Sequence, residues 1–108
     1  MASIKTHIED CKRLLGKGYR EVHEWLDFYA KSYNPWIYLE YHRKFRHTEK
    51  ALNEKFQEWG FYRQLAAKIH IIRDYEQYVL KKPFDQVEIE EIEELFEKSK
   101  MYLHWRKE

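Results

Sequence analysis

The chain has 108 residues, of which 44% are hydrophobic, 36% charged and 18% aromatic, and its formal net charge is +1. This length suits one helical domain, assigned to residues 1–108, with a single hydrophobic core. The near-neutral charge creates no global field that would draw in nucleic acid. No run of residues approaches the ~18 apolar residues of a membrane-spanning helix, so we expect no membrane span.

Cysteine usage and the N-terminal residues bear on the cellular compartment. Cys11 is the only cysteine, so no internal disulfide can form, which fits a reducing environment. The first residues contain no apolar segment typical of a secretory signal. Both features predict a cytoplasmic protein. Lys and Glu are plentiful while Asn and Gln are scarce, a composition that favours a thermophilic source.

Prolines and glycines fall only where helices should end, and they divide the chain into helical segments. The first predicted helix ends at Gly16, because glycine commonly follows a helix C-terminus. Asn34 and Pro35 form an N-cap and first-turn pair for the third helix, which Gly60 ends. The predicted helices cover about residues 3–15, 19–32, 35–59, 61–81 and 85–106.

The fifth predicted helix carries its own start signal, because Asp85-Gln86-Val87-Glu88 matches a capping box. No segment of the chain alternates apolar and polar residues over the length of a strand. We therefore predict an all-α fold, a single-domain antiparallel bundle of four or five helices in which the third is the longest.

The fourth predicted helix is expected near the centre of this bundle. Its main apolar stripe contains Tyr62 and Ile69, and Ala67, Ile71 and Tyr78 give it a second apolar side. A helix with two apolar sides can be covered by neighbours on both.

A His-x-x-x-Asp pattern occurs twice, as His23 and Asp27 in the second predicted helix and as His70 and Asp74 in the fourth. Residues four apart stack on one face of a helix. Both pairs lie about 100° and 140° around the helix from the apolar residue that precedes them. Imidazole and carboxylate are ligands that divalent transition metals prefer. The sequence therefore predicts that the two helices flank one shared site.

Other histidines extend the candidate site. His7 on the first predicted helix and His42 on the third can face the same interior, whereas His47 falls on the opposite side of its helix. The candidate metal ligands are His7, His23, Asp27, His42, His47, His70 and Asp74. The expected cofactor is a divalent ion of zinc, iron, nickel or manganese. In the alternative interpretation each aspartate hydrogen-bonds the neighbouring histidine and no metal is present.

Residues 41–47 form the only concentrated basic stretch of the chain. Arg43 and Arg46 could offer bidentate donors to a phosphate group. The alternative is a solvated helix face that the acidic start of the fifth predicted helix neutralises. Most aromatic residues fall on apolar stripes, so the sequence gives no indication of a nucleic-acid groove.

Four segments in order resemble a family of small uncharacterised proteins from bacteria, archaea and phages: His7, then residues 22–27, 42–47 and 69–74. That family shows a histidine, an IHEWxD-like segment, an HRxxRH segment and a closing HxxxD. The resemblance spans about residues 7–75, implies no reaction, and supports His47, Arg43 and Arg46 as site residues. The chain departs from it at Cys11, where a small hydroxyl residue is expected, and it lacks a glycine soon after Asp74.

The favoured function is a small metal-binding protein, with hydrolysis of a small anionic, phosphate-bearing substrate as the reaction. In that hypothesis the ion activates a water and Asp27 or Asp74 serves as ligand or general base. Arg43 or Arg46 would then meet the substrate. The alternative is a non-catalytic interaction module whose His-Asp pairs are structural and which docks a protein partner or a second copy. Nucleic-acid binding is a third and weaker alternative.

Overall fold

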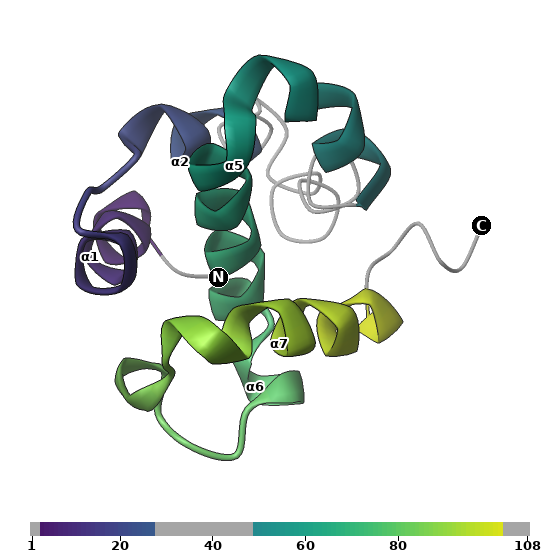
Figure 1. Ribbon diagram of the computed structural model, residues 1–108. Coiled ribbons are helices and arrows are strands. Elements are labelled where there is room, and N and C mark those ends of the chain that lie inside the picture. The colour runs from purple at the N-terminus through teal and green to yellow at the C-terminus, as the bar shows by residue number, and fades with distance from the viewer. Residues whose placement is uncertain (1–2, 28–48, 103–108) are drawn as a thin grey trace, which may run out of the picture.

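The computed structural model describes residues 3–27 and 49–102, which are drawn in colour in Figure 1. Within these two ranges all regular structure is helical, which confirms the predicted all-α class. The α-helices are α1 (Ile4–Leu15), α2 (Arg20–Leu26), α5 (Glu49–Asp74), α6 (Glu76–Val79) and α7 (Ile92–Ser99). Short 3-10 turns, η2, η3 and η4, cover Phe84–Gln86, Ile89–Glu91 and Lys100–Tyr102.

Helix α1 has the two ends that its sequence predicts. The side chain of Ser3 accepts a hydrogen bond from the backbone N–H of Thr6 at 3.2 Å, which caps the N-terminus. Gly16 adopts the left-handed conformation with φ 81°, and its N–H donates to the carbonyl of Lys12. These caps fix the helix whose first turns carry His7 and Cys11, both fully buried.

The turn between α1 and α2 is tight. A Cβ atom added at Gly18 would lie 2.7 Å from the Cγ2 atom of Ile8, so only glycine fits at this close approach. Tyr19 follows with φ 53°, an unusual backbone conformation for a residue with a side chain. Helix α2 then runs to Leu26, and Asp27 is its C-cap residue. The predicted continuation to residue 32 lies outside the described ranges.

Helix α5 consists of two helical parts joined by a kink at Gly60, where φ is 76° and ψ is 177°. This break confirms the predicted boundary between the third and fourth helices. After the kink, Ala66, Ala67, Ile69 and Ile71 are all fully buried, because α1, α2 and α7 pack against this helix. The expected central position of the fourth helix is confirmed. The part of the third predicted helix before residue 49 is not among the described residues.

Some predicted features of the central helix are wrong. Tyr62, placed on its main apolar stripe, is 61% exposed, and Tyr78, placed on its second apolar side, is 51% exposed. The helix ends at Asp74 instead of continuing to residue 81. Tyr75 leaves the helical conformation, with φ −108° and ψ 15°, and Tyr78 therefore belongs to the separate short helix α6.

The C-terminal region also differs from the prediction of one helix beginning at residue 85. The capping box joins Glu88 and Glu91, and the regular helix α7 starts only at Ile92. The reason is tertiary: Phe84 and Val87 are 1% and 0% exposed, so this segment is held against the core. Arg13 secures it by donating hydrogen bonds of 2.9 Å to the carbonyls of both residues.

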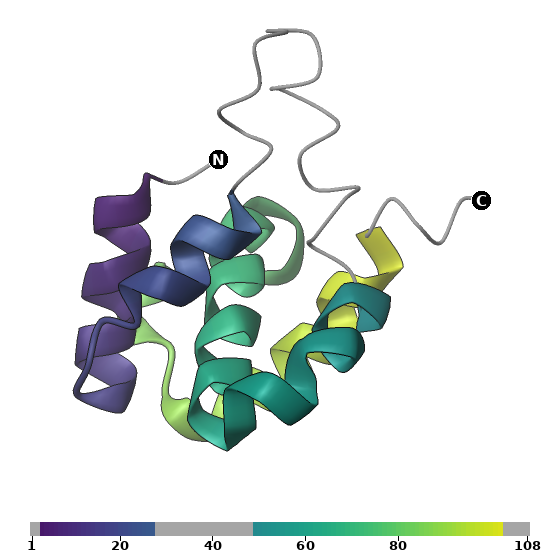
Figure 2. The ribbon, with the colours of Figure 1, turned by 90° about the horizontal axis from the view of Figure 1, so that it is seen from above.

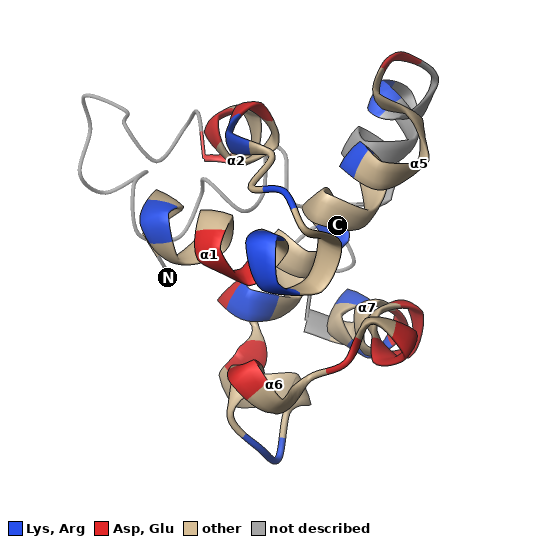
Figure 3. Ribbon diagram, turned by 60° about the vertical axis from the view of Figure 1, so that its left-hand side comes forward, with Lys and Arg blue, Asp and Glu red and all other residues tan. Residues whose placement is uncertain are grey.

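The described helices run in different directions. In Figure 1, α5 stands upright at the centre and α7 crosses it. Seen from above, α1 and α2 lie on one side of α5 and α7 on the other (Figure 2). The predicted antiparallel bundle is therefore not confirmed. Helix α7 carries mainly acidic charge, visible in red in Figure 3. No helix within residues 3–27 and 49–102 is long and apolar enough to cross a membrane.

Candidate metal centre

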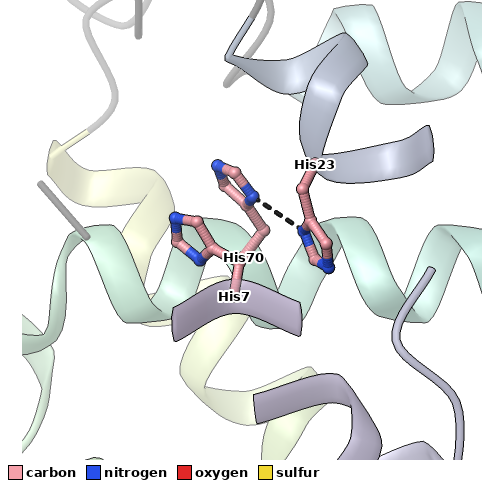
Figure 4. Close-up of side chains that lie close together, drawn as sticks. All are labelled: His7, His23 and His70. Atoms are coloured by element: carbon pink, nitrogen blue, oxygen red, sulfur yellow. Dashed lines mark hydrogen bonds between the residues drawn. The ribbon is translucent and has the colours of Figure 1, made fainter. Parts of the chain in front are cut away.

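Five polar side chains from three helices meet inside the protein. Helix α1 supplies His7, α2 and its C-cap supply His23 and Asp27, and the last turns of α5 supply His70 and Asp74. The three histidines are 0% exposed and the two aspartates 5% exposed. The imidazole rings lie close together, as Figure 4 shows. We call these five residues the His–Asp cluster.

His70 lies between the other members of the cluster. Its Nδ1 atom is 3.0 Å from Nδ1 of His23, the contact dashed in Figure 4. Its Nε2 atom is 3.1 Å from Oδ1 of Asp27 and 3.4 Å from Oδ2 of Asp74. The two nitrogens of one ring therefore face an imidazole on one side and two carboxylates on the other.

His23 is held from outside the cluster. Its Nε2 atom lies 2.9 Å from the carbonyl oxygen of Gly18, and a carbonyl can only accept a hydrogen bond. Nε2 of His23 must therefore carry a proton. A neutral His23 then presents the lone pair of Nδ1 towards His70. The tight turn at Gly18 positions the carbonyl that makes this bond.

His7 is the member of the cluster whose hydrogen bonding is incomplete. Its ring stacks on that of His70, with the centroids 3.5 Å apart and the planes 15° apart. Its Nε2 atom lies 3.3 Å from Oδ1 of Asp74. Neither ring nitrogen of His7 makes a hydrogen bond within the described parts of the chain, although both are buried. A buried polar atom without a partner is costly, so this histidine requires an explanation.

Burial keeps two of the histidines neutral. It lowers the pKa of His7 to about 4, and the nearby charge of His70 adds to the effect against the opposing influence of Asp74. Burial likewise lowers the pKa of His23 to about 3, helped by His70 and His7. Neutral imidazoles retain a nitrogen lone pair, which is the form that binds metal ions.

His70 has the opposite protonation. Burial alone would lower its pKa, but the charge of Asp74 and the hydrogen bonds to Asp27 and Asp74 raise the pKa to about 9. At neutral pH His70 is therefore an imidazolium facing two carboxylates. The carboxylates of Asp27 and Asp74 both lie against this one imidazolium.

The cluster contains two overlapping groups of candidate metal ligands. In each group the ligand atoms lie within 4.8 Å of one another, and His70 belongs to both. One group is His7, His23 and His70, and the other is Asp27, His70 and Asp74. Ligands ~2.1 Å from one ion are separated from each other by roughly 3.0–3.4 Å. Four contacts within the cluster, of 3.0, 3.1, 3.3 and 3.4 Å, fall in this range.

The structure brings together five of the residues selected from the sequence. The other four, His42, Arg43, Arg46 and His47, lie outside the described ranges. One partner of the cluster, the carbonyl of Gly18, was not predicted from the sequence, because a backbone acceptor leaves no mark in the residue types. The one sequence signal for this contact is that Gly18 precedes α2, the helix that carries His23.

Two neighbouring groups are not part of the cluster. Cys11 is fully buried, its Sγ atom is 3.9 Å from the carbonyl of Ala66, and burial raises the pKa of its thiol to about 12. It is therefore a small core residue and no nucleophile. Asp10 faces Arg73 at 3.3 Å, and burial raises the pKa of Asp10 to about 6 despite Arg73 and Arg13.

Comparisons with known proteins add no homologue to this description. No protein-family model, no curated protein and no solved structure matches the chain. The His–Asp cluster is therefore the feature that indicates a function.

Proposed function

We propose that the His–Asp cluster binds a divalent transition-metal ion and that the protein is a small metal-binding protein. The observation that carries this proposal is the state of His7. Both of its ring nitrogens are buried without a hydrogen bond, beside two other imidazoles and a carboxylate. Leaving one such atom unpaired costs roughly 1–3 kcal/mol. Coordination to an ion would give it a partner.

The donor atoms of the cluster support the same proposal. Three neutral imidazoles and two carboxylates around a divalent ion form an electrically neutral group. The donor set combines imidazole nitrogen, which suits zinc, iron and nickel, with carboxylate oxygen, which suits manganese. Ligands supplied by facing helices are also how metal sites in helical proteins are built.

The metal-free alternative accounts for only part of the geometry. An imidazolium at His70 between Asp27 and Asp74 makes a satisfactory buried ion pair without any metal. That alternative gives no role to His7, which stacks on the ring without hydrogen bonding. The metal-bound alternative gives His7 a role.

Hydrolysis of a phosphate-bearing substrate remains a prediction. A catalytic ion needs an open coordination position, whereas the five residues of the cluster are at most 5% exposed. Arg43 and Arg46, expected to meet the substrate, are outside the described residues. Burial favours an ion that joins α1, α2 and α5.

The interaction-module alternative has one observation in its favour. Phe61 and Tyr62 are 65% and 61% exposed, and their rings are in contact next to the kink at Gly60. Exposed aromatic residues are common in protein interfaces, but two side chains make a small patch. This alternative therefore ranks below metal binding.

The test is elemental analysis of protein purified without a metal-affinity tag, followed by thermal melts with and without a chelator. We expect close to one equivalent of zinc, iron, nickel or manganese per chain. An ion at a thousand times its Kd adds about 4 kcal/mol to stability, so the chelator should lower the Tm by more than about 10 °C. Protein that is metal-free as purified, and whose Tm ignores both chelator and added ions, would contradict the proposal.

A further inference from the structure

A chain of hydrogen bonds runs from the backbone into the His–Asp cluster. It begins at the carbonyl of Gly18, passes through both nitrogens of His23, and reaches Nδ1 of His70. It ends where Nε2 of His70 meets the two carboxylates. The donor and the acceptor of each of these hydrogen bonds can be assigned by starting from the carbonyl of Gly18.

The carbonyl of Gly18 fixes the direction of these hydrogen bonds. Its carbonyl can only accept, so Nε2 of His23 donates and Nδ1 of neutral His23 is left as an acceptor. Nδ1 of His70, 3.0 Å away, must then be the donor of that bond. Nε2, the other ring nitrogen of His70, faces the carboxylates of Asp27 and Asp74.

We infer that His23 is a positioning residue and no metal ligand, and that the ion is bound by His7, Asp27, His70 and Asp74. This assignment rests on the proposed metal site. The lone pair of Nδ1 in His23 is occupied by the N–H of His70, and that bond fixes the ring so that Nε2 faces the carboxylates. Metal-bound histidines usually donate their second N–H to such an outer partner. When the ion binds, the proton of His70 Nε2 is released to solvent.

The contacts of Asp74 support this set of four ligands. Its Oδ1 atom lies 3.3 Å from Nε2 of His7, and its Oδ2 atom lies 3.4 Å from Nε2 of His70. Asp27 reaches the same Nε2 atom of His70 at 3.1 Å. Asp74 therefore contacts Nε2 of both imidazoles, and both carboxylates contact Nε2 of His70.

The local backbone explains why His23 can hold this position. The space for a side chain at residue 18 is filled by Ile8, and Tyr19 takes a left-handed conformation with φ 53°. These two features set the direction of the Gly18 carbonyl towards α2. His23, which orients the proposed ligand His70, is thus itself held by the turn at Gly18.

The first test uses nitrogen-15 NMR of the zinc-loaded wild-type protein. A scalar coupling across the N–H···N bond should join Nδ1 of His23 and Nδ1 of His70. If His23 bound zinc through Nδ1, that coupling would be absent, and the assignment would be overturned. This measurement needs no variant, so it does not depend on the folding of a mutant.

The second test uses cobalt as a spectroscopic probe in metal-free wild-type protein and in three variants. His23→Leu should bind cobalt about 10–100-fold more weakly but with the wild-type absorption spectrum, because only an outer partner is lost. His23→Asn, which keeps an acceptor oxygen near the position of Nδ1, should recover part of the affinity. His7→Leu is the matched control, and its spectrum should change because a ligand is lost.

The outcomes separate the two proposals. A changed spectrum in His23→Leu would show that His23 is a ligand and would overturn this assignment alone. If wild-type protein bound neither cobalt nor zinc, the proposed function would fail and this assignment with it.

Discussion

The ring of His7 lies flat on the ring of His70, with centroids 3.5 Å apart, while its two nitrogens make no hydrogen bond. A neutral imidazole over an imidazolium gains some cation–π attraction. That attraction acts on the face of the ring and leaves the nitrogens at its edge unsatisfied. The stacking therefore explains where the ring of His7 lies in the metal-free protein. It does not explain why residue 7 is a histidine.

The metal-free protein should lose stability as the pH rises above neutrality. The pKa of His70 is raised from 6.5 to about 9 in the folded state. Between about pH 7 and 9 folded His70 keeps a proton that the unfolded chain has lost, so the free energy of unfolding falls with increasing pH. His7 and His23 are deprotonated in both states in the upper part of this window. Urea unfolding in the presence of chelator, at several pH values, measures the slope.

His70→Gln is the control for this pH dependence, because it keeps a polar side chain and removes the titrating group. Its stability should be nearly constant from about pH 7.5 to 9, where His7 and His23 are deprotonated in both states. If the free energy of unfolding of this variant fell with pH as steeply as that of wild type, a group other than His70 would cause the pH dependence.

Asp74→Asn should weaken both the fold and the metal site. The carboxylate contacts His7 and His70, and its loss leaves the buried imidazolium with Asp27 as its anionic partner. Breaking a buried pair costs on the order of 3 kcal/mol. Urea denaturation gives the loss in stability, and isothermal titration with zinc gives the loss in affinity. Asp85→Asn, at an exposed acidic residue, should change neither by more than about 0.5 kcal/mol.

Gly60→Ala should destabilise the protein although there is space for the methyl group. No atom lies within 4 Å of a Cβ built at Gly60, so any loss must come from the backbone. The pair φ 76° and ψ 177° is a conformation that is essentially restricted to glycine, and holding alanine there costs on the order of 1–3 kcal/mol. Gly16→Ala, with φ 81° and ψ 0°, should cost less, about 1 kcal/mol. Equal Tm values for Gly60→Ala and wild type would contradict the kink geometry.

Gly18→Ala should reduce metal affinity through the backbone. The added Cβ would lie 2.7 Å from Cγ2 of Ile8, so the turn must shift and move the carbonyl that holds His23. Ile8→Ala removes the obstructing methyl group, and the double variant should recover much of the lost affinity. Titration of the two single variants and the double variant with zinc gives the coupling. If the effects of the two substitutions on zinc affinity were simply additive, Gly18→Ala would not act through its contact with Ile8.

The sequence predicts where several helices near the site end and which of their faces point inward. Gly16 and Gly60 act through local backbone geometry, so the helix ends that they predict are the ends observed. The repeated His-x-x-x-Asp spacing acts through helix periodicity, which placed His23 and His70 on inward faces. Both signals depend on residues close in sequence, which is why they could be read from it.

Features set by tertiary contacts could not be read in the same way. The capping box expected at residues 85–88 gives way to one at Glu88 and Glu91, because Phe84 and Val87 pack into the core. Helix periodicity pairs each aspartate with the histidine of its own helix, yet Asp27 meets His70 of another helix at 3.1 Å. Periodicity gives the angle of a side chain around its helix and says nothing of how two helices dock or which ring nitrogen faces which oxygen.

The distribution of the His–Asp cluster over three helices has a consequence for how the protein opens. Residues 3–27 supply three of its members and α5 supplies the other two, so no single helix or hairpin can form the site alone. An ion bound there would be released by any opening motion that separates α1, α2 or α5. Hydrogen exchange at the amides of these three helices should then slow to one common rate when metal is added, because partial openings become as rare as complete unfolding.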